Sequence, residues 1–152
     1  MEELLLTDEA RAWVGREFDM PEFTVSERDI RQYAAALGGP VPPPGADDLS
    51  AQPLLYTALT RPILAPDDLT VDGLSEDRRA PVGEGRVMFG GIDVELVRPL
   101  KVGDQVRGRR KLISLEEKEG RRARFVVATW HTEYIDAGGE PVIRETSTQI
   151  LR

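Results

Sequence analysis

Hydrophobic and polar residues alternate through most of the second half of the chain. Four stretches show this period of two, at about 86–98, 105–115, 122–135 and 141–151. Such alternation is typical of strands that bury one face. The connections are short and contain glycine, with hairpin loops predicted at 116–120 and 136–140, so the strands are expected to pair antiparallel.

The first half shows helical spacing instead. Thr7 is suited to cap a short helix that ends near Val14, and residues 18–25 are interpreted as a short strand. Ser26 followed by Asp29 is a shortened capping box, and apolar residues then recur at helical spacing until the Gly38–Gly39–Pro40 stop. A second helix is predicted over about 52–59, followed by one long acidic loop over 65–85.

These elements predict an α+β protein in which a curved antiparallel sheet wraps around a helix. The length of 152 residues fits one domain. Long strands with unpaired edges favour pairing with a second chain, so a homodimer or heterodimer is expected rather than a monomer.

Charge and composition narrow the possible partners. The net charge is −7, which argues against general nucleic-acid binding. Residues 107–124 nevertheless hold eight basic and three acidic side chains. Within this stretch Arg121 and Arg122 are candidates to bind phosphate groups or an acidic partner, because guanidinium groups bind phosphate with paired hydrogen bonds. A charged hairpin held by Glu–Arg pairs is the alternative.

Other classes of site are disfavoured by what the sequence contains. The chain has no cysteine and one histidine, so no metal site and no cofactor are expected. Its acidic beginning with a short apolar run does not resemble a signal peptide, and no window is apolar enough to span a membrane. We therefore expect a cytoplasmic protein that does not bind a membrane.

Several motifs occur in an order that resembles one family. The capped helix with its preceding strand comes first, followed by a double glycine, an Arg-Pro-Leu turn, a Gly-Asp pair and a charged hairpin; these are 23–38, Gly90–Gly91, 98–100, Gly103–Asp104 and 117–121. The set resembles MaoC-like hot-dog proteins, in particular the N-terminal, FAS1-like half-domain of double hot-dog hydroxyacyl-thioester dehydratases and enoyl hydratases. The resemblance covers 18–152 and implies a single hot-dog domain over 1–152, with 1–17 as an N-terminal extension.

The resemblance implies a thioester-linked acyl chain in a tunnel at a dimer interface, and addition or removal of water at C2–C3. The acyl chain is then expected on coenzyme A or on an acyl carrier protein, which Arg121 and Arg122 are candidates to dock. Active members carry an aspartate and a histidine just after the first helix. In this chain Gly39 stands where the aspartate is expected, and the only histidine is His131. Without an acid and a base within reach of the substrate, hydration has no proton donor or acceptor.

The remaining candidates each have a structural and a functional interpretation. His131 lies in the middle of a strand and is interpreted as structural rather than catalytic. Gly90 and Gly91 mark a bulge in a curved sheet, and they also allow a thioester to approach the backbone. Tyr33 and Tyr56 are helical and either line an acyl pocket or pack in the core.

Three functions remain open. The first is a non-catalytic subunit of a heteromeric (R)-3-hydroxyacyl-thioester dehydratase or enoyl-thioester hydratase, inactive alone, which shapes the acyl tunnel beside a partner carrying the Asp/His dyad. The second is a self-sufficient homodimeric hydratase or thioesterase that uses acids at other positions. The third is an acyl-thioester-binding or scaffold protein without chemistry. All three belong to fatty acid or polyketide metabolism.

Overall fold

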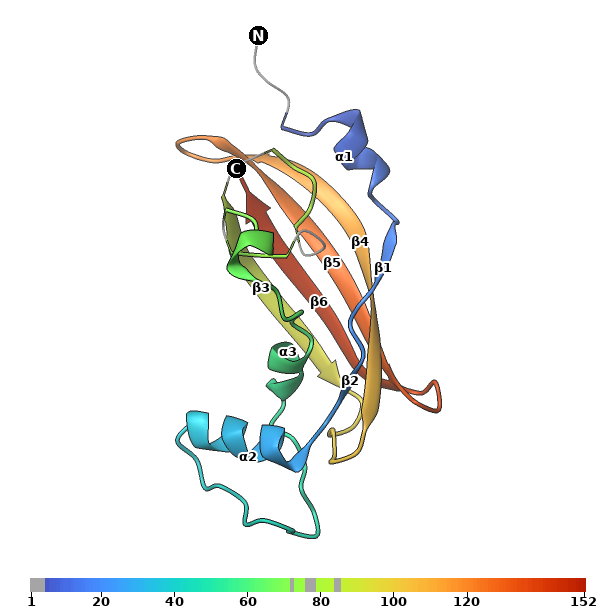
Figure 1. Cartoon of the computed structure of the whole chain (residues 1–152). Helices are drawn as coiled ribbons and strands as arrows, with labels where there is room; N and C mark the ends of the chain where they lie inside the picture. The colour runs from blue at the N-terminus through green and yellow to red at the C-terminus, as the bar shows by residue number, and fades with distance from the viewer. Residues whose placement is uncertain (1–4, 72, 76–78, 84–85) are drawn as a thin grey trace.

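The protein is built on one antiparallel sheet of six strands. The computed structural model describes residues 5–71, 73–75, 79–83 and 86–152. The strands follow the order β1-β4-β5-β6-β3, and β2 also pairs with β4 (Figure 1). Their bounds are β1 Glu17–Asp19, β2 Phe23–Thr24, β3 Val87–Leu96, β4 Gln105–Glu119, β5 Arg124–Asp136 and β6 Pro141–Leu151.

The four long strands predicted from the alternation are confirmed, but the predicted position of the loop between the second and third of them is wrong. Pairing between β4 and β5 continues to Glu119 and Arg124, so the turn falls at 120–123 instead of 116–120. The charged residues at this end alternate between faces as strand residues do, and Arg124 forms an ion pair with Glu117 on the neighbouring strand. Cross-strand pairing therefore extends the ladder through residues that a polar composition suggests are a loop.

The predicted strand over 18–25 is two short strands, because Pro21 interrupts it. Proline has no N–H to donate to a ladder, and it lies in the gap between β1 and β2. Both pieces pair with β4, so the segment still follows one edge of the sheet.

The helices begin where the capping residues predict. Thr7 caps α1 (Asp8–Ala12) through its side chain. Ser26 and Asp29 form the reciprocal capping box that starts α2 (Glu27–Ala36). Gly38 follows α2 with a φ of 74°, a conformation that favours glycine.

The segment after α2 contains less regular structure than predicted. The helix α3 covers only Leu55–Leu59, because 53–54 form a turn before it. The long loop contains one turn of 3₁₀ helix, η1, over Pro66–Asp68. Residues 72, 76–78 and 84–85 of this loop, and 1–4 of the expected N-terminal extension, lie outside the described residues. No helix in the described parts of the chain is both long and apolar enough to cross a membrane.

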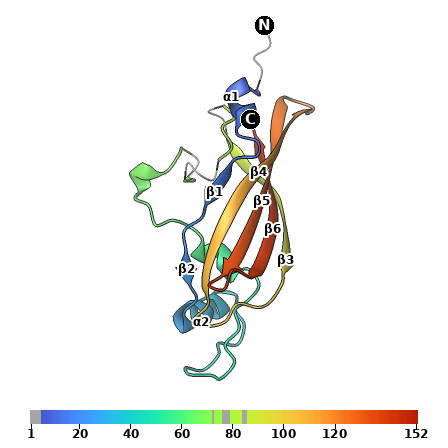
Figure 2. The same ribbon diagram turned by 90° about the vertical axis from the view of Figure 1, so that its right-hand side faces the viewer.

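All of these helices lie on one face of the curved sheet, which we call the inner face (Figure 2). Two apolar clusters cover its ends. The α2-side cluster includes Ile30, Tyr56, Val106, Tyr134 and Ile143. The α1-side cluster includes Ala10, Leu112, Val126, Trp130 and Leu151. The two clusters together form the core that positions α2 and α3 against one end of the sheet.

Between the clusters, polar side chains cross the inner face. Alternation along β4, β5 and β6 brings them to the same side, and the register places Arg110 opposite Thr132 and Thr132 opposite Glu145. We call this set the polar belt; its members are Arg110, Thr132, Glu145, Ser147 and Gln149. The belt divides the apolar core in two, which is unusual for the buried face of a sheet.

The outer face carries a row of alternating charges. Glu95, Arg144, Glu133, Arg109 and Asp19 are successive partners across five strands. Arg144 pairs with Glu95 at 3.1 Å and with Glu133 at 3.3 Å. Arg109 lies 3.6 Å from Asp19. Opposite charges therefore face each other across the strands of the solvent-exposed side.

An arginine ties two turns together at one end of the sheet. Arg98 donates hydrogen bonds to both carboxylate oxygens of Asp104, at 2.7 and 3.2 Å, and to Asp136 at 3.2 Å. The hydrogen bond from Arg98 lowers the pKa of Asp104. Backbone N–H groups of the turn, with Arg98, lower the pKa of Asp136. Both carboxyl groups are therefore held in the charged form.

Candidate functional site

A cavity of about 350 Å³ lies over the polar belt. Its floor is formed by belt residues from β4, β5 and β6, and Thr57 and Thr60 line it from the side of α3. Phe89 and Ile92 of β3 and Met20, which follows β1, contribute apolar walls. The cavity thus combines apolar walls with a polar floor, as small-molecule sites commonly do.

Glu145 and Tyr56 form the central hydrogen bond of this site. The Tyr56 hydroxyl donates to Glu145 Oε2 at 2.7 Å. The tyrosine is 0% exposed, and its ring packs edge-on against Tyr134 with centroids 5.2 Å apart. Burial, together with the neighbouring carboxylate, raises the pKa of Tyr56 far above its usual value. Tyr56 therefore remains a hydrogen-bond donor at any physiological pH.

Arg110 brings a positive charge to the same floor. It is 6% exposed, and its guanidinium carbon lies 4.0 Å from the centre of the Trp130 ring. Guanidinium groups stack favourably on indole, and the contact gains strength where water is excluded. The Trp130 Nε1–H in turn donates to Gln149 Oε1 at 3.0 Å. Stacking and hydrogen bonding hold these three side chains in fixed orientations.

The edge strand β3 borders the cavity, to which it contributes Phe89 and Ile92. Within the described residues no strand pairs with the outer edge of β3, and Phe89 is 73% exposed there. The register against β6 shifts between Phe89 and Gly91, so the bulge expected at the double glycine is confirmed. A Cβ on Gly90 would lie 2.6 Å from the Thr148 Oγ1, so glycine is required by close approach at this position.

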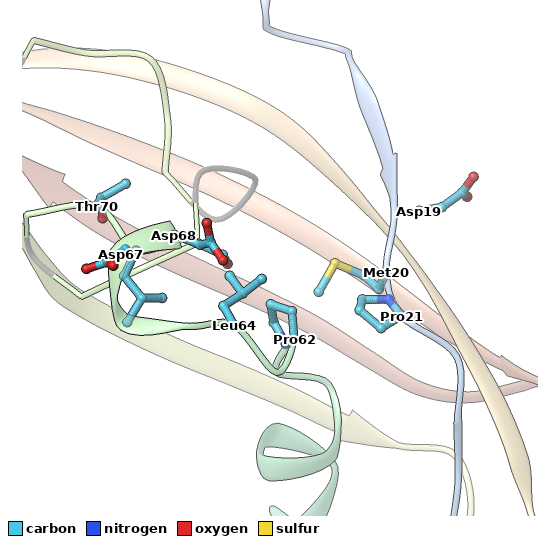
Figure 3. A pocket seen from close by; sticks show the side chains of 10 residues that line it. Asp19, Met20, Pro21, Pro62, Leu64, Asp67, Asp68 and Thr70 are labelled. Carbon is cyan, nitrogen blue, oxygen red and sulfur yellow. The ribbon is translucent and has the colours of Figure 1, made fainter.

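A second, wider opening of about 800 Å³ lies between the end of β1 and the loop that contains η1. Figure 3 shows Met20 and Pro21 on one side, with Pro62, Leu64 and the two aspartates of η1 on the other. Those aspartates are solvent-exposed, and no group of potential metal ligands occurs among the described residues. The belt cavity is the better candidate site because its polar side chains are buried or half-buried, and hydrogen bonds or ring contacts orient Glu145, Gln149 and Arg110.

Gly39 stands where the resemblance implies a catalytic aspartate, and it lies away from the cavities. Gly39 is exposed, follows the C-terminal end of α2, and lines neither cavity. A Cβ placed there would lie 3.9 Å from the Ala34 carbonyl, an ordinary contact distance. The backbone therefore accommodates a side chain at 39, and its absence is not imposed by crowding.

The sole histidine lies on the wrong face for this cavity. His131 alternates with the buried Trp130 and Thr132 along β5, so its ring is on the outer face. There its Nδ1 lies 3.4 Å from the Thr146 hydroxyl oxygen. The sheet itself separates this imidazole from Glu145.

The other predicted site residues lie at different distances from the cavity. Tyr33 is half-buried on α2 and packs against the α2-side cluster, which also contains Tyr56. Gly90 and Gly91 lie in β3, beside the apolar wall. Arg121 and Arg122 are exposed in the β4–β5 turn, at the end of the sheet remote from α2 (Figure 1). The structure brings Tyr56 and the double glycine to one region and leaves the two arginines outside it.

The sequence interpretation overlooked Glu145 and its belt neighbours. A signal for them exists, because Glu145, Ser147 and Gln149 alternate between the buried Ile143 and Leu151 of β6. Polar residues on a strand face that is otherwise buried and apolar indicate a cavity there, because polar groups packed in an apolar core without partners are costly.

Comparison with known proteins finds a match to one family model, described as FAS1-like, dehydratase domain region, over residues 12–145. No curated protein sequence matches the chain. Among solved structures, the HadBC 3R-hydroxyacyl-ACP dehydratase complex of Mycobacterium tuberculosis superposes with a TM-score of 0.62 and 22% identity, covering 91% of this chain and 96% of that one.

Two further structures are similar. The ChsH1–ChsH2 complex of Mycobacterium tuberculosis gives a TM-score of 0.66 at 16% identity, covering 94% of this chain and 89% of that one. The MaoC-like dehydratase of Rhodospirillum rubrum gives 0.61 at 19% identity, covering 91% of each chain. Together with the antiparallel curved sheet, this likeness confirms the predicted α+β hot-dog fold.

Proposed function

Because the chain belongs to the family of FAS1-like dehydratase domain regions, we propose that it is a non-catalytic subunit of a heteromeric (R)-3-hydroxyacyl-thioester dehydratase or enoyl-thioester hydratase. A second hot-dog chain carries the Asp/His dyad, and this chain, folded as one domain over 1–152, contributes the wall of the acyl tunnel. The acyl group is carried on coenzyme A or on an acyl carrier protein.

The observation that carries this proposal is that neither Gly39 nor His131 brings an acid or base to the belt cavity. Hydration and dehydration need a proton acceptor and a proton donor within hydrogen-bond reach of C2 and C3. Gly39 offers neither, and His131 faces away across the sheet. A chain with this cavity but without the dyad is suited to hold substrate for chemistry performed by another subunit.

The open β3 edge supports a partner that completes the site. Exposed apolar residues lie along this strand, including Met88, Phe89 and Ile92. Pairing with another strand would satisfy the free backbone groups of the edge and cover these side chains. Two of the similar structures are described as complexes, HadBC and ChsH1–ChsH2, which agrees with a hot-dog partner.

The remaining candidate residues take supporting roles in this proposal. Gly90 and Gly91 let the thioester and its pantetheine arm approach the backbone of β3. Tyr33 and Tyr56 contribute to the acyl pocket, Tyr56 by fixing Glu145. Arg121 and Arg122 lie away from the cavity on an exposed turn, where they would receive the phosphates of coenzyme A or the acidic surface of a carrier protein.

Affinity purification of the tagged chain from its native host tests the proposal, with mass spectrometry of proteins recovered in equal amount. We expect a second hot-dog chain with an aspartate and a histidine after its first helix. The reconstituted pair should hydrate crotonyl coenzyme A, and the same pair with the partner's dyad aspartate changed to asparagine should not. Recovery of a homo-oligomer alone would overturn the split-enzyme proposal.

One observation favours a second candidate, a self-sufficient homodimeric enzyme. Glu145 is a carboxylate at the cavity floor, fixed by a hydrogen bond, and carboxylates serve as general acids and bases in many enzymes. The pure chain should then hydrate an enoyl thioester or hydrolyse a saturated one, and Glu145→Gln should abolish turnover. Tight thioester binding with neither turnover nor a partner would instead favour a scaffold protein.

A further inference from the structure

The polar belt is not explained by holding a plain hydrocarbon chain. Thr132, Glu145, Ser147 and Gln149 line the middle of a cavity whose flanking walls are Ile92, Phe89 and other apolar groups. A saturated acyl chain lying across the belt would displace water from these polar groups and could not replace the hydrogen bonds that the water makes. Leaving buried polar groups unpaired is costly, so such a floor disfavours a fully saturated ligand.

Among the described residues that line the cavity, Glu145 is the one negatively charged acceptor. Its Oε2 accepts from Tyr56, and its Oε1 accepts no hydrogen bond from the described residues. The buried Tyr56 holds the carboxylate from one side, and its raised pKa keeps the tyrosine protonated, as the donor, at neutral pH. The second oxygen is therefore positioned to accept from a donor that enters the cavity.

The neighbours of Glu145 suit an oxygen that both donates and accepts. Thr132 lies directly opposite Glu145 on β5, and Ser147 is the next inward-facing residue on β6. Both hydroxyls can donate to an incoming oxygen while Glu145 accepts from it. An alcohol fits this arrangement, whereas a ketone lacks the proton that Glu145 would accept in a hydrogen bond.

We propose that the belt cavity is a specificity site for an acyl chain that carries a hydroxyl group beyond C3, with Glu145 accepting the hydrogen bond of that hydroxyl. The inference rests on the proposed function, since it assumes that the cavity holds the acyl part of a thioester. It adds a substrate class: hydroxylated acyl chains bind in preference to saturated ones. The reaction that supplies such a substrate must leave an alcohol along the growing chain, as ketone reduction without dehydration does.

Discrimination of this kind can be strong. Sites built to hydrogen-bond a hydroxyl reject the analogue that lacks it, because their polar groups are then left unpaired. Glu145, Ser147 and Gln149 are only half-buried, so water reaches them, and we expect a smaller effect than in a closed site, about tenfold in affinity for the isolated chain. Covering the cavity with a partner should increase the ratio.

The test compares decanoyl coenzyme A with a series of hydroxydecanoyl coenzyme A isomers in which the hydroxyl is moved stepwise along the chain. Binding is measured by calorimetry on the full-length chain, and again on the co-purified complex if a partner is found. At least one isomer with its hydroxyl beyond C3 should bind about tenfold tighter than decanoyl coenzyme A. That preference should disappear in Glu145→Leu and shrink in Glu145→Gln, which keeps an acceptor but loses the charge.

A matched carboxylate controls for general electrostatics. Glu133 lies on the neighbouring strand but on the outer face, where it pairs with Arg144. Glu133→Gln removes the same charge without touching the cavity and should leave the preference unchanged. Circular dichroism and a thermal melt verify that each variant is folded, and Tyr56→Phe supplies a second cavity variant that should weaken the preference by releasing Glu145.

The outcomes separate this inference from the proposed function. Equal affinity for every isomer and for decanoyl coenzyme A would overturn the hydroxyl site and leave acyl binding standing. A preference that survives Glu145→Leu would also overturn it, since another group would then carry the selectivity. Failure of all the thioesters to bind, to the chain and to its complex alike, would overturn both the inference and the proposed function.

Discussion

The hydrogen bond between Tyr56 and Glu145 should contribute measurably to stability as well as to the site. Tyr56→Phe keeps the ring, its burial and its contact with Tyr134, and removes only the hydroxyl. Hydrogen bonds to charged groups are worth about 1.5–3 kcal/mol. Glu145 is only half-buried, so water in the cavity recovers part of this, and we expect a loss near the lower end, about 1–2 kcal/mol.

Urea unfolding followed by far-ultraviolet circular dichroism measures this loss. With a slope of about 2 kcal/mol per molar urea, the midpoint should fall by about 0.5–1 M while the slope stays unchanged. Tyr33→Phe is the matched control, because Tyr33 is half-buried and makes no side-chain hydrogen bond within the described residues. Its midpoint should move by no more than about 0.2 M.

A double-mutant cycle with Glu145→Gln assigns the effect to the pair. The coupling free energy should be about 1 kcal/mol, since the charged acceptor and the hydroxyl depend on each other. Additive effects, or a Tyr56→Phe midpoint equal to that of the Tyr33→Phe control, would refute the reasoning. Either result would mean that the carboxylate is oriented by something other than this tyrosine.

Gly90→Ala should destabilise the protein by about 1–3 kcal/mol, because its Cβ would overlap a side chain and a carbonyl of β6, whereas Gly91→Ala, with 3.6 Å of clearance, should change the melting temperature much less. The two aspartates paired with Arg98 have lowered pKa values, so their contribution to stability is present above about pH 4 and lost as the pH falls further. Arg98→Met should therefore flatten the decline of the urea midpoint between about pH 5 and pH 3, and an unaltered decline would contradict this assignment. Changing Arg121 and Arg122 together to glutamate should weaken binding of thioester or carrier protein and reduce its salt dependence, and unchanged binding at low salt would exclude the docking role.

The sequence predicted most of the architecture because local signals determine it. Ser26 and Asp29 define the start of α2 whatever the tertiary context, and the period of two in the second half specifies strands directly. The β4–β5 turn was misplaced because Glu116 to Glu119 are charged. Their strand conformation comes from pairing with β5, which a single stretch of sequence does not reveal.

The site was harder to predict because it depends on which face each strand buries. Alternation along one strand shows which of its residues share a face. Only the assembled sheet shows that Glu145 of β6 faces the helices and that His131 of β5 faces outward. The importance of Tyr56 also depends on a partner 89 positions away. Contacts of such long range are set by packing and leave no local pattern.

The charge row on the outer face has a consequence for how reliably the sheet assembles. Sliding β6 past β5 by two residues keeps every side chain on its proper face, so burial alone penalises this error weakly. The charge row disfavours the shifted alignment, because Arg144 would then lie opposite His131 or Ile135 instead of Glu133 and its ion pair with Glu133 would be lost. Exposed pairs that add little to equilibrium stability can thus guide the strands to one alignment during folding, and prevent kinetically trapped sheets with shifted strands.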